Sequence, residues 1–187
     1  MPSESDDYRA MDEFQILFTA VQIEDRVRQL GEELTKDFAG ETPIFVAVMQ
    51  GAVIFFADLI RHVQLDLLCD FVSVSSYGDE MQPAGDPLLL HGPRHDWRGR
   101  AVVFVEAVVD TGSTARLLYA LAEERSAQSV TICALLDKPS RRSFPLRVDY
   151  KGFTAPDVFV VGYGLDYAGR MRNLPEIGLM TRGSIRA

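Results

Sequence analysis

The sequence predicts an α/β domain with a mostly parallel central sheet flanked by helices. Short apolar stretches with the pattern of buried strands alternate along the chain with longer segments of helical periodicity, an order typical of α/β folds. Polar residues directly follow several of these strands, at the place where open parallel sheets bind their ligands. A length of 187 residues is enough for one sizeable core and short for two, so we expect a single domain over 1–187.

The first half of the chain contains two expected helices and two expected strands. Apolar residues at Ile23, Val27, Leu30 and Leu34 have the spacing of one helical face. The expected elements are a helix at 22–38, a strand at 43–52, a helix at 53–63 and a strand at 69–78. Residues 1–14 are acidic and polar, and we expect them to form a flexible tail.

The second half continues the alternation after a segment of poor periodicity. Residues 78–98 are rich in Gly, Pro, Asp and His, so we expect a long loop or flap there. The following elements are a strand at 101–110, a loop at 111–114, a helix at 115–126, a strand at 129–137, a loop at 138–145, and a pair of strands around 147–153 and 157–166. Several polar residues of interest follow the carboxyl ends of these strands.

The composition argues against several classes of function. A net charge of −8 disfavours broad nucleic-acid binding, which needs clustered Lys and Arg. No apolar run approaches the roughly 20 residues that span a bilayer, and the N-terminal residues lack the pattern of a signal peptide. We therefore expect a cytoplasmic protein with no membrane partner. Cys69 and Cys133, far apart in apolar surroundings, are expected to be buried free thiols.

Two groups of arginines leave a local basic site open. They are Arg141, Arg142 and Arg147 around one loop, and Arg170, Arg172 and Arg182 near the C-terminus. These side chains either meet a polyanionic small molecule or are solvated surface charges. The sequence pattern alone allows both interpretations.

The stretch VVFVEAVVDTGST, residues 102–114, places two carboxylates in and after an apolar strand. Its D-T-G-S-T segment supplies consecutive N–H groups at a helix N-terminus, hydroxyl groups and one glycine, which together suit a phosphate monoester. Alternatively, Asp110 or Ser113 simply caps the helix. The segment is neither a Walker A loop nor a G-x-G-x-x-G loop. A carboxylate inside a buried strand is costly unless it is paired or coordinates something, so Glu106 favours the functional interpretation.

The same stretch resembles the phosphoribosyl-diphosphate motif of type I phosphoribosyltransferases. The blocks VSVSSYGDEM, LLDKPSRR and PDVFVVGYGLDYAGRMRNLPEIG, and their order, resemble the bacterial hypoxanthine-guanine phosphoribosyltransferases. The resemblance extends from about Ile23 to about Leu179. It implies the type I phosphoribosyltransferase fold, with a small hood formed by terminal segments and a mobile flap. It also implies a homodimer or homotetramer.

The reaction implied by the resemblance is Mg²⁺-dependent. A 6-oxopurine, hypoxanthine or guanine, displaces pyrophosphate from phosphoribosyl diphosphate and gives IMP or GMP. On this basis Asp110 acts as general base or proton partner near N7 of the purine. Lys138 donates to the exocyclic oxygen, which adenine lacks. Phe159 stacks on the base, and Val160 presents backbone groups to its edge.

The remaining roles concern the sugar, the phosphates and the metal. The resemblance implies that Thr111, Gly112, Ser113 and Thr114 hold the 5′-phosphate, and that Glu106 contacts the ribose hydroxyls. Asp166 and Glu106 are the expected Mg²⁺ ligands. Gln50, Gly51 and Arg172 are expected to bind the pyrophosphate, whose charge must be neutralised as it leaves. Ser76 and Tyr77 belong to the flap, which is expected to close over the site and exclude water.

The sequence departs from the family at two site positions and in the flap. Gln50 stands where the family usually has Lys or Arg, often after a cis peptide bond. Ala107 stands where the family has the second acid of a Glu-Asp pair, a loss worth about 1.5–3 kcal/mol. The flap reads PLLLHGPRHD in place of a lysine-containing segment followed by acids. These changes keep open a binding protein with a sensor or regulatory role and little turnover. A generic flavodoxin-like nucleotide binder explains less of the sequence.

Overall fold

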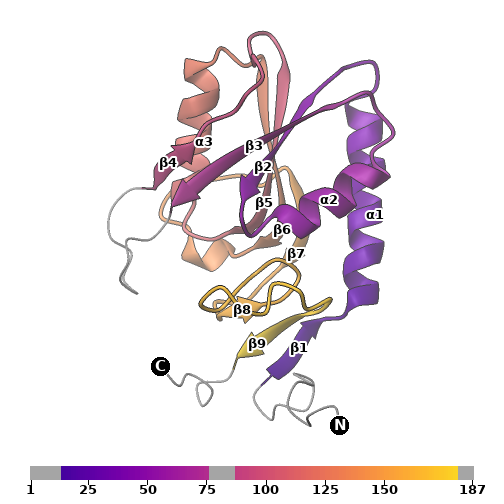
Figure 1. Ribbon diagram of the computed structural model, residues 1–187, viewed down its shortest axis with the longest axis vertical. Coiled ribbons are helices and arrows are strands. Elements are labelled where there is room, and N and C mark those ends of the chain that lie inside the picture. Colours follow the sequence, from indigo (N-terminus) through magenta and orange to yellow (C-terminus); the bar gives the residue numbers. More distant parts are fainter. Residues whose placement is uncertain (1–13, 76–86, 181–187) are drawn as a thin grey trace, which may run out of the picture.

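The computed structural model describes residues 14–75 and 87–180 (Figure 1). Its main sheet has the strand order β4-β3-β2-β5-β6-β7. The strands are β2 (Ile44–Met49), β3 (Leu68–Ser75), β4 (Leu88–His91), β5 (Ala101–Val109), β6 (Ser129–Asp137) and β7 (Tyr150–Thr154). All neighbours pair in parallel except β3 and β4, which are antiparallel. The predicted mostly parallel sheet is thus confirmed.

Three helices cover the two faces of this sheet, as predicted (Figure 1). They are α1 (Ala20–Asp37), α2 (Val53–His62) and α3 (Ser113–Glu124). The first two pack on the face that carries Val103 and Val105 of β5, and α3 packs on the face that carries Val102 and Phe104. Because successive side chains of a strand point to opposite faces, β5 is apolar on both sides and is buried along almost its whole length.

Two details of sequence explain how α1 is placed. Thr19 and Gln22 form a capping box at its start, with the Thr19 hydroxyl accepting from the Gln22 N–H and the Gln22 side chain accepting from the Thr19 N–H. Gly31 lies against His62 of α2, where a Cβ atom would come within 2.5 Å of the His62 Cβ. Helices α1 and α2 therefore cross at a distance that only glycine permits.

A second sheet of three antiparallel strands forms the predicted hood. Its strands are β1 (Phe14–Phe18), β8 (Val160–Val161) and β9 (Ile177–Met180), in the order β1-β9-β8. It lies beyond the carboxyl ends of the parallel strands (Figure 1). The sequence pattern indicated neither β1 nor β9, and β1 begins at Phe14, the last residue of the expected tail. Strands β7 and β8 lie at the two expected ranges, 147–153 and 157–166, but they do not pair with each other, because β7 pairs with β6 and β8 pairs with β9.

The expected long loop over 78–98 is also partly wrong. Residues 88–91 form β4, the antiparallel edge strand of the main sheet. The next residues pack on the core through Trp97, whose side chain is fully buried. Residues 76–86 lie outside the described residues. Within the part of the chain that is described, no helix is both long enough and apolar enough to cross a membrane.

The sheet topology places a ligand crevice between β2 and β5. These strands are neighbours, but the chain leaves their carboxyl ends in opposite directions: β2 leads through α2 to β3, and β5 leads through α3 to β6. Open α/β sheets bind ligands at such a switch point. The loops that follow β2 and β5 are the two segments in which the sequence analysis expects pyrophosphate and phosphate binding.

Asp70 holds the return of the chain from β4 to β5. Its buried carboxylate accepts hydrogen bonds from the backbone N–H groups of Phe71 (2.9 Å), Arg94 (3.0 Å) and His95 (3.0 Å), and from the indole N–H of Trp97 (3.4 Å). Burial raises the pKa of Asp70, but these donors outweigh burial and hold the pKa below its ordinary value. The ionised carboxylate is therefore the form that the fold stabilises.

We expect Asp70→Asn to lower the free energy of unfolding by about 1.5–3 kcal/mol at pH 7, because an amide cannot satisfy the same donors. The stability due to Asp70 is complete above its ordinary pKa and is lost as the pH falls through the lower pKa of the folded state, so the difference shrinks in acid. Urea unfolding at pH 7 and pH 3 measures both effects. Asp96→Asn is the control, since exposed Asp96 accepts only the Arg98 N–H. Equal stability of Asp70→Asn and wild type at pH 7 would contradict the prediction.

Candidate functional site

The loop after β5 has the geometry of an open anion site. Gly112 is the N-cap residue of α3, with φ of 91°, so the N-cap position itself has no side chain to bond the helix. The alternative that Asp110 or Ser113 caps α3 is therefore wrong. A Cβ atom on Gly112 would also lie 3.0 Å from the ring of Phe144. The hydroxyl of Thr111 accepts from the Ser113 N–H (3.3 Å) and lies 3.0 Å from the Ser113 hydroxyl.

The loop after β6 fixes the backbone of this phosphate loop. Arg142 donates from Nη1 to the carbonyl oxygens of Val109 (2.7 Å) and Asp110, and from Nη2 to the carboxylate of Asp137. The N–H and hydroxyl of Ser143 both donate to the carbonyl oxygen of Thr111, each at 3.0 Å. Three consecutive carbonyl groups of residues 109–111 are thus held from one side. This role was not predicted from the sequence, in which its only signal is the S-R-R run that follows Lys138.

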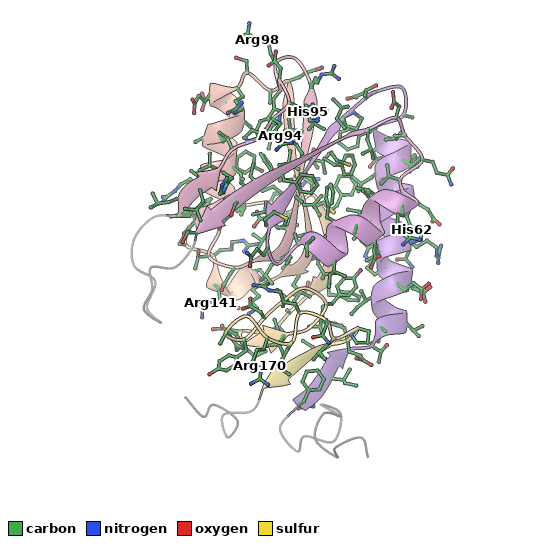
Figure 2. All side chains as sticks on the ribbon, in the orientation of Figure 1. His62, Arg94, His95, Arg98, Arg141 and Arg170 are labelled. Atoms are coloured by element: carbon green, nitrogen blue, oxygen red, sulfur yellow. The ribbon has the colours of Figure 1, made fainter. Side chains whose placement is uncertain are left out.

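Arg141, Arg142 and Arg147, the first arginine group, differ in burial and in contacts. Arg142 is mostly buried in the contacts just described, whereas Arg141 lies at the mouth of the crevice and Arg147 has a side chain that is 86% exposed. Arg141 Nε lies 2.8 Å from Oδ1 of Asp110, and its Nη1 donates to Asp157 at 3.0 Å. Figure 2 shows Arg141 at the hood side of the sheet and Arg98 at its opposite end. Only Arg147 fits the interpretation of a solvated surface charge.

The residues expected to bind a base lie beside the phosphate loop. The backbone N–H of Lys138 donates to the carbonyl oxygen of Val109 (3.0 Å), and its buried Nζ donates to the carbonyl oxygen of Val158 (2.7 Å). Burial lowers the pKa of Lys138, an effect opposed by the charges of Asp110 and Asp157. Phe159 is 57% exposed, a large fraction for a phenylalanine. Its exposed ring meets Tyr167 edge to face at 6.0 Å.

Phe159 and Val160 are therefore placed differently. Val160 is buried in β8 of the hood, and its backbone pairs with Leu179 of β9. Phe159 directly precedes this strand and leaves its ring open to solvent. An exposed aromatic ring next to a buried lysine and a helix N-terminus offers a stacking face, a hydrogen-bond donor and an anion site in one crevice.

The loop after β2 meets the segment after β8 on the other side of the crevice. Arg172 donates to the carbonyl oxygen of Gly164 (2.7 Å), pairs with Oδ1 of Asp166 (2.7 Å), and lies 3.4 Å from Oε1 of Gln50. The peptide bond between Met49 and Gln50 is cis, as the resemblance predicts. A Cβ atom on Gly164 would lie 2.3 Å from the carbonyl oxygen of Gly51, so the two segments are in backbone contact.

Glu106 and Ala107 point to opposite faces of β5. Ala107 faces the loop after β2, since a Cβ atom on Gly51 would lie 3.4 Å from the Ala107 Cβ. Glu106 lies toward α3, where its charge acts on Tyr119 and is itself acted on by Arg142. It is only 4% exposed, and its Oε1 has no hydrogen-bond partner among the described residues. Burial raises the pKa of Glu106 to about 8, against the opposing charge of Arg142. A buried, unpaired carboxyl group of this kind is typical of functional sites.

Asp166 is the better placed of the two expected metal ligands. Its side chain is 31% exposed, with Oδ2 accepting from the Gly169 N–H (2.7 Å) and Oδ1 paired with Arg172. Across the described ranges, 14–75 and 87–180, no three His, Cys, Asp or Glu side chains are grouped as a metal site. Mg²⁺ needs only one or two carboxylates when waters and substrate phosphates supply its other ligands. Asp166, which is partly exposed beside Arg172, is the candidate ligand for such an ion, while Glu106 is buried on the α3 side of β5.

The structure brings the predicted site residues that it describes to one crevice. The converging residues are Gln50, Gly51, Glu106, Asp110, Thr111, Gly112, Ser113, Thr114, Lys138, Phe159, Val160, Asp166 and Arg172. Ser76 and Tyr77 lie outside the described residues. A separate cavity of about 580 Å³ between α1, α2 and residues 173–175 contains none of them. We assign the site to the crevice, because it combines the switch point with the open helix N-terminus and the unpaired Glu106.

Comparison with known proteins gives one consistent result. Residues 16–168 match the phosphoribosyl transferase domain family. The chain is 41% identical to the hypoxanthine-guanine phosphoribosyltransferase of Bacillus subtilis over 165 residues, which are 88% of this chain and 92% of that protein. It is 42% identical to the enzyme of the same name from Streptococcus pneumoniae, with the same coverage.

Solved structures agree with this match. A hypoxanthine-guanine phosphoribosyltransferase from Bacillus anthracis has a TM-score of 0.85 at 37% identity and covers 91% of this chain and 100% of that chain. A hypoxanthine phosphoribosyltransferase from Staphylococcus aureus has a TM-score of 0.87 at 34% identity and covers 95% and 97%. The predicted fold, including the hood, is therefore confirmed.

We expect Glu106→Gln to raise the melting temperature by several degrees at pH 8 and to leave it unchanged at pH 4. Between the ordinary pKa of the group and about 8, the unfolded chain carries an ionised Glu106 and the folded chain a neutral one, so this residue lowers stability as the pH rises. Glutamine removes that cost. Thermal unfolding across this pH range measures the effect, with exposed Glu124→Gln as the control. Loss of stability in Glu106→Gln at every pH would contradict the prediction.

Proposed function

The chain belongs to the type I phosphoribosyltransferase family, and we propose that it transfers the 5-phosphoribosyl group from phosphoribosyl diphosphate to hypoxanthine or guanine. The products are IMP or GMP and pyrophosphate, as in purine salvage. The names of the relatives support the choice of base. The observation that carries the proposal is the position of Lys138, whose buried ammonium group reaches the segment of Phe159 directly beside the phosphate loop.

In the proposed reaction a purine nitrogen forms a bond to C1 of the ribose while the bond from C1 to the pyrophosphate oxygen breaks. The purine loses one proton, and Asp110 accepts it at the N7 side of the base. Asp110 suits this role because it starts the phosphate loop and because its side chain is 39% exposed at the crevice. The N–H groups of residues 111–114 and the hydroxyls of Thr111 and Ser113 bind the 5′-phosphate.

The base is selected by the polarity of its exocyclic group. Lys138 Nζ offers only hydrogen-bond donors, so it pairs with the carbonyl oxygen of a 6-oxopurine and rejects the amino group of adenine. Its present acceptor, the carbonyl oxygen of Val158, keeps the buried ammonium group hydrogen-bonded before a base arrives. Phe159 supplies a stacking face for the ring.

The leaving group meets Gln50, Gly51 and Arg172. The guanidinium of Arg172 supplies positive charge where the pyrophosphate departs, and the close contact of Gly51 with Gly164 sets the width of this part of the crevice. Mg²⁺, held by Asp166, would supply further neutralisation of the phosphate oxygens when bound. Location in the cytoplasm and assembly as a homodimer or homotetramer stay predictions from the sequence.

We expect wild-type protein to form IMP or GMP from hypoxanthine or guanine in the presence of Mg²⁺, and to leave adenine unchanged. Ala107→Asp should raise the rate roughly ten- to hundredfold, because Ala107 faces Gly51 and a carboxylate there restores a charge-assisted hydrogen bond to substrate or metal worth about 1.5–3 kcal/mol. Ala107→Asn, which has similar size and no charge, is the control. A spectrophotometric assay of nucleotide formation with hypoxanthine, guanine, xanthine and adenine measures both expectations.

A second function is favoured by the two departures from the family, Gln50 and Ala107, which lie on the same side of the crevice. In this case the protein binds phosphoribosyl diphosphate or a nucleotide as a sensor and turns over little. The same assay separates the two. If wild type and Ala107→Asp both fail to convert any purine while phosphoribosyl diphosphate still binds by calorimetry, the enzyme proposal is overturned and the sensor proposal is supported.

A further inference from the structure

Arg141 forms ion pairs with two segments of the base site. It ends the short 3₁₀ turn Pro139–Arg141 that directly follows Lys138. Its guanidinium lies 2.8 Å from Asp110 Oδ1 on one side and 3.0 Å from Asp157 Oδ1 on the other. Asp110 begins the phosphate loop, and Asp157 lies two residues before Phe159. The side chain of Arg141 therefore spans the mouth of the crevice.

The two oxygens of the Asp110 carboxylate are placed differently. Oδ1 is buried, and the Arg141 ion pair is its close polar contact, without the alignment of a hydrogen bond. The Asp110 side chain as a whole is nevertheless 39% exposed. The exposed area thus belongs to the rest of the side chain, which includes Oδ2. Arg141 holds one oxygen, and the other has no hydrogen-bond partner among the described residues.

Arg141 and its neighbours Arg142 and Ser143 contact different parts of the phosphate loop. Arg142 and Ser143 hold the backbone carbonyl groups of residues 109–111, and neither forms a hydrogen bond or ion pair with the Asp110 side chain in the described part of the chain. Arg141 contacts that side chain and makes no side-chain hydrogen bond to the loop backbone. The position of the phosphate loop and the orientation of the carboxylate are therefore set by different residues.

We propose that Arg141 is a positioning residue that holds Asp110 by Oδ1 and presents Oδ2 to the purine, with Asp157 anchoring the far side of the guanidinium. This inference rests on the proposed function, since it gives the open oxygen the proton of the base. Ion pairs as exposed as these contribute little to stability. The effect of Arg141 is accordingly on the geometry of proton transfer, where a small misplacement lowers the rate strongly.

The experiment compares Arg141→Ala, Arg141→Lys and Asp157→Asn with wild type. The measurements are kcat, KM for phosphoribosyl diphosphate and melting temperature. We expect Arg141→Ala to lower kcat roughly 10- to 100-fold and to change KM less than about threefold, because Arg142 and Ser143 still hold the phosphate loop. The melting temperature should stay close to that of wild type.

The other variants separate positioning from a structural role. Arg141→Lys should recover part of kcat, since an ammonium group can pair with Asp110 but cannot bridge to Asp157 as well. Asp157→Asn keeps the Asp110 ion pair and should cost less than Arg141→Ala. Arg147→Ala is the control, because its side chain is 86% exposed and its ion pair within the described ranges is with Asp149.

Two results would overturn the role of Arg141 in an active enzyme. One is a kcat of Arg141→Ala within twofold of wild type. The other is a rise in KM with unchanged kcat, which would mean that Arg141 binds the substrate anion directly. If wild type converts no purine at all, the proposed function fails, and the role of Arg141 fails with it. The activity of wild type thus shows whether the proposed function or only the role of Arg141 has failed.

Discussion

Burial of β5 between two layers of helices is the constraint on which the rest of the structure depends. Helices α1 and α2 cover one face of this strand and α3 covers the other, so β5 is apolar along most of its length. Polar groups avoid a large desolvation penalty only beyond the end of this strand. The phosphate loop begins at that end, and the opposite directions in which β2 and β5 continue open the crevice beside it. Glu106 is the exception. Its buried carboxyl group lowers the stability of the fold and is typical of a functional site.

Three loops then share the work of the crevice. The loop after β5 supplies the helix N-terminus and Asp110. The loop after β6 supplies Lys138 and the two arginines that contact the loop after β5. The segments around β8 supply Phe159, Asp166 and Arg172. The charges in these loops are paired within the protein: Arg142 with Asp137, Arg141 with Asp110 and Asp157, and Arg172 with Asp166. These pairs hold guanidinium groups beside the crevice in a chain whose net charge is −8.

Elements with strong periodicity were predictable from the sequence, and those that depend on distant partners were not. The apolar run of β5 and the face of α1 with Ile23, Val27 and Leu30 follow directly from residue spacing. Strands β1 and β9 are short and lie at opposite ends of the described chain, so only their pairing in the hood reveals them. The strand β4 was hidden because its segment is rich in turn-forming residues, and because the chain after it is held by Asp70, which accepts N–H groups of Arg94, His95 and Trp97 from across the loop.

The site shows the same division. The D-T-G-S-T pattern indicated an anion site from its residue types, but only the structure shows that Gly112, and not Asp110 or Ser113, is the N-cap residue of α3. The roles of Arg141 and Arg142 could not be told apart in the sequence, because both follow Lys138 in one charged run. Ala107 was recognisable as a departure from the family, whereas its orientation toward Gly51 required the alternation of β5 in three dimensions.

The most direct test of this account is a crystal structure of the protein with IMP. The account predicts that the 5′-phosphate lies within hydrogen-bond distance of the N–H groups of residues 111–114, that Phe159 stacks on the base, and that Asp110 Oδ2 faces N7. A nucleotide bound with its phosphate away from this loop, or with its base away from Lys138 and Phe159, would contradict it.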